Sequence, residues 1–417
     1  MLTSLGLEQP THKFQEKAVS GFQQARTGAV RDAACNLDLH LVSDWEEFEA
    51  LEPVWNDLFE RVGQSHNLFQ SYNWNWHWCQ SYLRSDPKTN ALALSIVVGM
   101  REGRAVMIWP LLSNRHMGVK YVCWMGMPVS QYSDVLIEDG PDRLSWLEDG
   151  WNFICSRLGA DMVCVPKVRE DAALSSLLCA LEVEPVQQAE APYADLAEAG
   201  NYEVYASRFS SRLRKNRRRQ HRRLSEQGDV SIEVLTEGET ACAAAQQAID
   251  MKRRWLQNQG LVSKAFSDNR IDAFFASALS SPDKPAGCQV SVLKVGSDIV
   301  ATVIGFVCNG RYATHICAYN LDPKFAHSGA GSLLIDATVQ DCLEKGLENF
   351  DMMAPGDAYK YEWTDATVMV SDYAVPLTPR GRAYAAFGAC AYSAKAAFKT
   401  VPQRMRRALL AVVGPKV

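Results

Sequence analysis

The chain has 417 residues, which exceeds the size of one ordinary hydrophobic core and predicts two domains. Its 47% hydrophobic and 22% charged residues are typical of a globular protein, and no apolar run is long enough to span a bilayer. A net charge of −5 gives no overall attraction to polyanions. The first residues lack the basic start and apolar core of a signal peptide, so we expect a cytoplasmic protein, peripheral to the inner membrane at most.

Twelve cysteines are scattered singly along the chain, and none forms a C-x-x-C pair or has a histidine at zinc-ligand spacing. In a cytosolic chain of this size, such cysteines are typical small buried hydrophobes. We therefore expect neither a disulfide framework nor a bound metal.

The first half of the chain predicts an α/β domain over residues 36–195, after a flexible leader over residues 1–35. Apolar and polar residues alternate in the first predicted strand, and apolar residues then recur every three or four positions, as on one face of a helix. The predicted strands are Asn36–Val42, Ala91–Met100, Ala105–Leu112, Tyr121–Met125, Asp134–Glu138 and Met162–Val165, and the predicted helices begin at Ser43 and Leu144.

The second half, residues 200–378, repeats this order of elements. Its predicted strands are Val230–Leu235, Gln289–Val295, Ile299–Cys308, Tyr312–Tyr319 and Asn349–Met353, and its helices are Thr240–Gln257 and Ser332–Leu343. Asn309-Gly310, between two of these strands, is a strong hairpin signal. The repetition predicts two related domains, each a mixed and mostly antiparallel sheet flanked by helices, followed by a basic amphipathic tail over residues 379–417.

A glycine-rich loop lies between the strand Tyr312–Tyr319 and the helix that begins at Ser332. Gly329 and Gly331 allow successive backbone N–H groups to converge on one point, and the helix N-terminus adds partial positive charge. A pyrophosphate fits this arrangement, and the strand could pair with the amides of a pantetheine arm. The alternative is an ordinary helix entrance that binds nothing.

Three segments give the chain a resemblance to a known family. They are the basic opening Ser210–Arg218, the segment Tyr319–Pro323 before the glycine loop, and Phe350–Lys360 followed by Trp363. In this order they resemble the acyl-CoA-binding half of the GNAT acetyltransferases. The match over residues 39–365 looks like the CelD/BcsL-type acetyltransferases of bacterial polysaccharide synthesis, which are related to the FemABX aminoacyltransferases. The GNAT loop pattern begins with Arg or Gln, where this chain has Ala326.

The resemblance implies two GNAT-like domains with a substrate cleft between them, and acetyl-CoA as the acyl donor without a metal. It implies an N-acetyltransferase whose acceptor is an amino sugar or a lipid- or nucleotide-linked glycan precursor. The donor-binding residues would be Cys317, Ala318, Tyr319, His327, Ser328, Gly329, Ala330, Gly331 and Ser332.

Acyl transfer to an amine requires a base for the amine proton, a donor for the thioester oxygen and an acid for the departing thiolate. Asp134, which enters a strand of the first domain, is our candidate base; the alternative is a strand-start aspartate. Lys360 could stabilise the oxyanion or hold a phosphate, and Asp357 could fix the loop or accept a proton. Tyr359 could serve as the acid. The alternatives are a solvated lysine and a packed tyrosine.

The run Arg208–Arg223 is densely basic. Arg212, Arg214 and Arg218 could bind a phosphorylated acceptor, and we place Tyr132 in the same substrate site. The other interpretations are a solvated interdomain helix and a nucleic-acid site; without interleaved aromatic residues we expect no nucleic acid. The spacing of Arg214 and Arg218 also permits a cyclic dinucleotide.

The basic tail could lie on an anionic membrane surface or act as a disordered solubilising segment. Two other functions remain open at this point. One is a FemABX-like transferase that takes its acyl group from aminoacyl-tRNA. The other is a non-catalytic module of a polysaccharide complex that senses a cyclic dinucleotide.

Overall fold

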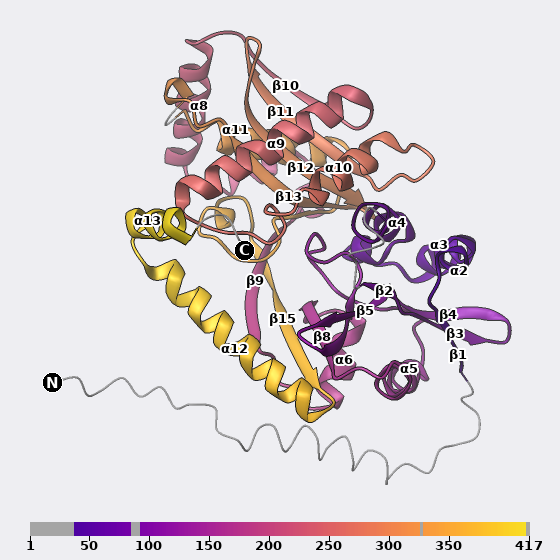
Figure 1. The fold of residues 1–417 in the computed structure, drawn as a ribbon. Helices are drawn as coiled ribbons and strands as arrows, with labels where there is room; N and C mark the ends of the chain where they lie inside the picture. The colour runs from indigo at the N-terminus through magenta and orange to yellow at the C-terminus, as the bar shows by residue number, and fades with distance from the viewer. Residues whose placement is uncertain (1–36, 85–91, 326–327, 414–417) are drawn as a thin grey trace.

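The computed structural model describes residues 37–84, 92–325 and 328–413. The leader expected over residues 1–35 lies outside the described residues. Figure 1 shows two α/β halves, the first carrying β1 to β8 and the second carrying β10 to β14, joined through long strands in the middle.

The first half contains nine strands and six helices among the described α and β elements. The strands are β1 (Asp38–Val42), β2 (Ala93–Leu94), β3 (Ile96–Arg101), β4 (Arg104–Trp109), β5 (Leu111–His116), β6 (Val119–Trp124), β7 (Leu136–Ile137), β8 (Met162–Arg169) and β9 (Gln187–Asp195). The helices up to β9 are α2 (Trp45–Ala50), α3 (Glu52–Val62), α4 (Tyr72–Trp78), α5 (Arg143–Arg157) and α6 (Ala173–Ala180), and α7 (Tyr202–Ser207) follows.

The second half begins with the basic helix and repeats the order strand, helices, three strands, helix and strand. Its strands are β10 (Val230–Leu235), β11 (Cys288–Val295), β12 (Asp298–Cys308), β13 (Arg311–Tyr319), β14 (Asn349–Asp351) and β15 (Ala366–Pro376). Its helices are α8 (Ser211–Ser225), α9 (Gly238–Gln259), α10 (Arg270–Ser280), α11 (Ala330–Glu344), α12 (Pro379–Thr400) and α13 (Gln403–Val413).

The strands form a four-stranded sheet in the order β1-β3-β4-β7 and an eleven-stranded sheet in the order β10-β11-β12-β13-β14-β9-β15-β8-β6-β5-β2. Only β13–β14 and β6–β8 are parallel among the described strand pairs. The expected fold class, mixed and mostly antiparallel sheets flanked by helices, is therefore confirmed.

The two halves exchange their last strands. β9, which ends the first predicted domain, pairs with β14 of the second, and β15 pairs with β8 of the first. β9 and β15 also pair with each other along seven residues. The division at residues 195–200 remains a prediction, but each half is completed by a strand from the other, so neither half closes its sheet alone.

Several expected elements differ in the structure. The strand expected over Ala105–Leu112 is two strands in different sheets, because Pro110 lies between β4 and β5 and has no backbone N–H to pair. β9 is a strand that we did not predict, at the end of the first predicted domain. The tail is helical over its described part, in α12 and α13. None of the helices in the described ranges is long and apolar enough to cross a membrane.

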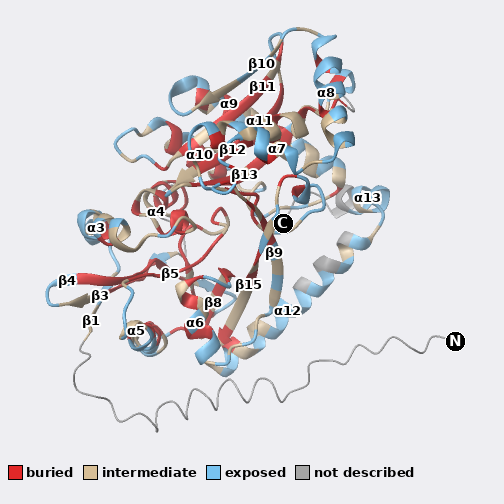
Figure 2. Ribbon diagram, turned by 180° about the vertical axis from the view of Figure 1, so that it is seen from behind, coloured by how far each residue is buried: buried red, intermediate tan, exposed pale blue. Residues whose placement is uncertain are grey.

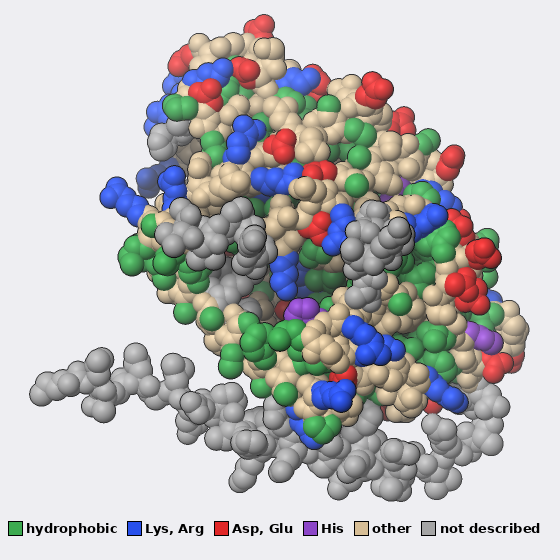
Figure 3. All heavy atoms as spheres, viewed as in Figure 1, with side chains coloured by type: hydrophobic (Ala, Val, Ile, Leu, Met, Phe, Trp, Pro, Cys, Tyr) green, Lys and Arg blue, Asp and Glu red, His purple; other side chains and the backbone are tan. Residues whose placement is uncertain are grey.

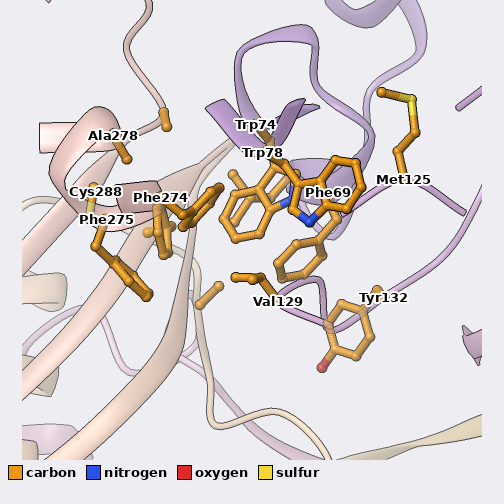
Figure 4. Close-up of a cluster of buried hydrophobic side chains, with 14 of the residues drawn as sticks. Phe69, Trp74, Trp78, Met125, Val129, Tyr132, Phe274, Phe275, Ala278 and Cys288 are labelled. Carbon is orange, nitrogen blue, oxygen red and sulfur yellow. The ribbon is translucent and has the colours of Figure 1, made fainter. Parts of the chain in front are cut away.

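The junction between the halves is an aromatic core rather than an open space. Trp74 of α4 meets Phe274 of α10 and Phe306 of β12 edge-on, each at a ring-centroid distance of 4.9 Å. Figure 4 shows this cluster, with Trp74 and Phe69 of the first half facing Phe274 and Phe275 of the second. Figure 2 shows that buried residues continue along the central strands from one half to the other. Burial of aromatic surface on this scale fixes the orientation of the halves.

Candidate functional site

The site begins where β13 and β14 separate. These parallel strands pair only through Arg311–Asn349, Tyr312–Phe350 and Ala313–Asp351. β13 then continues to Tyr319, paired with β12 on one side only among the described strands. The backbone groups on its other side are free to pair with an extended ligand, in the manner of an added strand.

A buried ionic cluster ends β14. The Asp351 carboxylate is fully buried and accepts hydrogen bonds from the hydroxyl of Tyr132, at 3.0 Å to each oxygen, and from the Met353 N–H at 2.8 Å. Arg311 and Arg169 bring their guanidinium groups to 3.1 and 3.5 Å from it. Met353 has a φ of +57°, so the chain turns away from the strand direction. This cluster therefore fixes the point at which the strands separate.

This geometry does not favour the substrate-binding role that we predicted for Tyr132. Its hydroxyl is buried and engaged by Asp351, and the Arg169 guanidinium lies 4.9 Å from its ring centre. Burial and the Asp351 charge hold the pKa of the Tyr132 hydroxyl above its ordinary value. Tyr132 thus links the first half to β14.

Lys360 lies in the loop that follows β14 and is only 7% exposed. Its Nζ donates to the carbonyls of Met353 and Pro355, each at 2.7 Å. Burial holds the pKa of this ammonium below its ordinary value, while the carboxylate of Asp357 opposes that effect. The solvated-lysine alternative is wrong, because two of the three N–H donors hold the loop and one is left for a ligand.

A second cation, half-buried, approaches from α9. Lys252 directs its Nζ toward the Cys317 carbonyl at 3.5 Å, and burial lowers its pKa as well. Both Lys252 and Lys360 act electrostatically on the Cys317 thiol, and the charge of Asp357 acts on both lysines. Tyr359, beside Lys360, is 42% exposed. The structure thus brings Cys317, Lys360, Asp357 and Tyr359 together on one side of β13.

A cavity of about 300 Å³ adjoins this edge. It is lined by Tyr319 and the three residues that follow β13, and by Met251 and Arg254 of α9. The same chain segment continues into the glycine loop. Figure 3 shows the surface hollowed near the middle of this face, with Lys and Arg side chains beside hydrophobic ones in the hollow.

The glycine loop leads directly into α11 (Ala330–Glu344). Gly329 has a φ of +74°, a region that favours glycine, and as the N-cap residue it has no side chain to accept a helix N–H. Ser328 is buried and its Oγ accepts the Ala330 N–H at 3.3 Å. A Cβ on Gly331 would meet only a Tyr319 ring atom, at 3.9 Å, so the approach to this backbone is open. His327 and Ala326 lie outside the described residues, so their predicted contacts are not placed.

The basic helix α8 packs on α11 through residues that the sequence did not single out. Arg217 is buried and pairs with Asp336 of α11, and its guanidinium stacks 4.3 Å from the Phe209 ring centre. Gln220 lies against Gly329. A Cβ atom added at position 329 would be only 2.2 Å from the Nε2 atom of Gln220. Its Oε1 is buried and has no hydrogen-bond partner among the described residues.

The three arginines predicted to bind substrate have different surroundings. Arg214 donates to the carbonyls of Ala206 and Phe209, at 3.3 and 3.0 Å, at the end of α7. Arg212 and Arg218 are exposed. Because the Arg214 guanidinium serves the protein's own carbonyls, the pairing of Arg214 with Arg218 for a cyclic dinucleotide has no support from this geometry.

Asp134 has a structural environment rather than that of a base. Its carboxylate accepts the N–H groups of Ala173 and Leu174, at 3.3 and 3.0 Å, at the start of α6, where the Ala172 cap position offers no side chain. Asn67 donates to it at 3.1 Å. The residue is 3% exposed, so the carboxylate caps α6 and holds it to the loop before β7.

His315 is enclosed on β13 at a register shift opposite Ile304 and Gly305. Its Nε2 lies 2.8 Å from the Val129 carbonyl, which can only accept, so Nε2 carries the proton. The rings of Phe275 and Phe306 surround it at centroid distances of 5.6 and 5.8 Å. Burial lowers its pKa to about 4, which keeps the ring neutral near neutral pH.

Comparisons with known proteins place this geometry in a fold family. Residues 211–361 match the family model of the acetyltransferase (GNAT) domain. Among solved structures, FemX has a TM-score of 0.53 at 9% identity, covering 78% of this chain and 94% of that chain. A tandem GNAT protein from the clavulanic acid biosynthesis pathway has a TM-score of 0.47 at 13% identity, covering 82% and 99%. L-PGS from Bacillus licheniformis has a TM-score of 0.48 at 12% identity, covering 80% and 92%.

No curated protein matches the chain. The matched residues include the separated strands and the glycine loop, so this part of the chain is similar to a GNAT acetyltransferase domain, a fold that implies the use of an acyl-CoA. FemX shares the fold. The GNAT part of the expected resemblance is confirmed, and the CelD/BcsL type stays a prediction. No cluster of three or more His, Cys, Asp or Glu in the described part of the chain could hold a metal.

Proposed function

We propose that this protein is an acyl-CoA-dependent N-acyltransferase, with acetyl as the acyl group. Its acceptor is an amino sugar or a glycan precursor of bacterial polysaccharide or cell-envelope synthesis. The observation that carries the acyl-CoA part is the separation of β13 from β14, with Lys360 and Lys252 beside the free edge and the glycine loop at the far end. The resemblance of three segments to CelD/BcsL-type enzymes supports the acceptor class.

The residues present fit an acyl-CoA. The free edge of β13 supports pairing with the amides of a pantetheine arm. At its end, the first turn of α11 presents N–H groups suited to a pyrophosphate beyond that of Ala330, which Ser328 accepts, and Gly331 leaves that approach open. When bound, the cofactor supplies the acyl group as a thioester.

Gln220 of α8 takes the place of the Arg or Gln that the GNAT loop pattern carries where this chain has Ala326. Its amide packs directly on Gly329 and keeps one buried oxygen without a protein partner. We assign to it the positioning of the loop at the phosphate site. Arg217 and Asp336 hold α8 on α11 and so keep Gln220 in place.

Lys360 performs two tasks in this proposal. Two of its N–H groups order the loop after β14, and the third is available to the oxygen on which negative charge develops during attack on a thioester. Burial strengthens this interaction because the local dielectric is low. A lysine with a depressed pKa also returns a proton more readily than an exposed one.

The test is a mass-spectrometric screen for acyl transfer from acetyl-CoA to free, nucleotide-linked and lipid-linked amino sugars. Calorimetric titration with CoA is run beside it. We expect CoA to bind and one acceptor class to gain an acetyl group. Product formation should be lost in Lys360→Met and kept in Lys345→Met, which changes an exposed lysine at the end of α11.

Three outcomes distinguish the alternatives. Absence of CoA binding, together with transfer from charged tRNA, would replace the proposal with an aminoacyl-tRNA-dependent transferase. Tight binding of a cyclic dinucleotide without any transfer would replace it with a sensing module. Binding of CoA without transfer to any amino sugar would keep the acyl-CoA site and refute the acceptor class.

A further inference from the structure

The C-terminal helices α12 and α13 carry apolar side chains that face solvent. Phe387 of α12 is 60% exposed, and Met405 and Leu409 of α13 are 58% and 48% exposed. From Ala383 to Ala394, α12 contains no charged residue, and after Ala385 its described side chains up to Ala394 are exposed on every side of the helix. An apolar helix with this exposure is expected to have a further partner.

The charge of the same segment is strongly one-sided. Residues 379–417 hold eight Lys and Arg and no Asp or Glu, in a chain whose net charge is −5. On α13, Arg404 and Arg407 are exposed and lie within one turn of the apolar pair. Figure 3 shows hydrophobic side chains gathered along α12 and α13, at the lower left of the view, with Lys and Arg near the upper end.

α13 is held in a defined orientation. Gln403 donates to the Asn258 carbonyl of α9 at 2.6 Å, and the half-buried Arg406 packs against Gly260, which ends that helix. With Arg406 turned toward α9, the neighbouring Met405 and Leu409 point outward. α9 also supplies Lys252 and lines the cavity at the β13 edge, so the exposed surface lies beside the candidate acyl site.

We propose that α12 and α13 form a docking surface for an anionic phospholipid membrane. Phe387, Met405 and Leu409 would enter the boundary between headgroups and acyl chains, and the cations would lie among the phosphates. A nucleic acid would use the cations but not the apolar side chains. A membrane uses both, and the absence of carboxylates over 379–417 removes repulsion from an anionic surface.

The experiment measures binding of the full chain to vesicles of phosphatidylcholine with and without phosphatidylglycerol, by co-sedimentation. We expect binding to the anionic vesicles only, weakening with salt. Each of Arg404→Gln and Arg407→Gln should lower the partition coefficient about five-fold, the factor for one cation near an anionic surface. Met405→Gln with Leu409→Gln should lower it at least ten-fold.

The matched controls are exposed residues elsewhere on the molecule. Arg222→Gln on α8 and Ile232→Gln on β10, which is 44% exposed, should leave binding unchanged. CoA binding is measured on every variant and should not change, so that this test is independent of the acyltransferase proposal.

Four results would overturn the docking proposal. They are absence of vesicle binding, equal binding to neutral and anionic vesicles, equal losses in the control variants, and a dimer in light scattering that Met405→Gln with Leu409→Gln dissociates. The last result would assign the surface to a second copy of the chain.

Discussion

Lowering the pH from 7 to 4 should cost this protein about 3 kcal/mol of folding free energy through His315 alone. The ring has a pKa of about 4 in the folded chain against an ordinary 6.5, because burial among aromatic rings penalises its charged form. One pKa unit corresponds to about 1.4 kcal/mol, so the full gap corresponds to about 3 kcal/mol. Between pH 4 and pH 6.5 the unfolded chain binds more protons at this residue than the folded chain does. The contribution of His315 to stability is therefore fully present above pH 6.5 and is lost as the pH falls to 4.

The assay is chemical denaturation of the wild type and His315→Gln at pH 7 and pH 5. Glutamine keeps an N–H donor for the Val129 carbonyl but does not titrate, so the variant should lose about 2 kcal/mol less than the wild type at pH 5. Carboxylates that are paired in the folded state lose stability equally in both proteins and cancel. An exposed histidine substituted the same way, His40→Gln, should behave like the wild type. Equal acid losses in wild type and His315→Gln would refute the reasoning.

Three further changes test the site. Gly329→Ala should weaken CoA binding at least ten-fold in calorimetry, because a Cβ at a φ of +74° collides with Gln220. The control Gly346→Ala has a similar φ of +69° but no neighbour near its Cβ, so it should leave CoA binding intact. Equal effects of the two variants would contradict this reasoning. Asp351→Asn should lower the free energy of unfolding by about 3 kcal/mol, since the buried Arg311 guanidinium loses its counter-charge and Arg169 keeps only Asp171. Asp341→Asn, at the partly exposed end of α11, should cost less than about 0.5 kcal/mol. Lys360→Met should lower kcat far more than it raises KM, measured by steady-state kinetics; a change in KM alone would make it a ground-state binding residue.

Much of the architecture follows from local patterns. Alternation and helical spacing predict the three-stranded meander, the glycine loop and α11 in the order observed, because these elements are set by residues close to one another in the chain. The Asn309-Gly310 turn joins β12 and β13 as expected. These predictions needed no knowledge of distant contacts.

The candidate site could be predicted only in part. Lys360 and the glycine loop lie in motifs, so a pattern points to them. Lys252 is 65 positions from its Cys317 partner, and Gln220 is more than 100 positions from Gly329, so no spacing in the sequence announces either contact. Asp134 is the reverse case, a residue that we predicted to be catalytic and that the structure places in a capping position. The family resemblance suggested it as the base, but its carboxylate oxygens accept N–H groups at the start of α6, some 40 positions later.

The sequence by itself therefore determined the order of elements in the two α/β halves, the glycine loop and the basic helix, since hydrophobic period, turn residues and local charge are properties of short segments. The tertiary structure decided the exchange of β9 and β15 and the burial of Lys360. It also decided that Asp351 is enclosed by Arg169 and Arg311. The physical reason is that strand pairing and desolvation depend on which segments meet across the whole chain. A carboxylate or ammonium becomes functional or structural only when its neighbours in space are set.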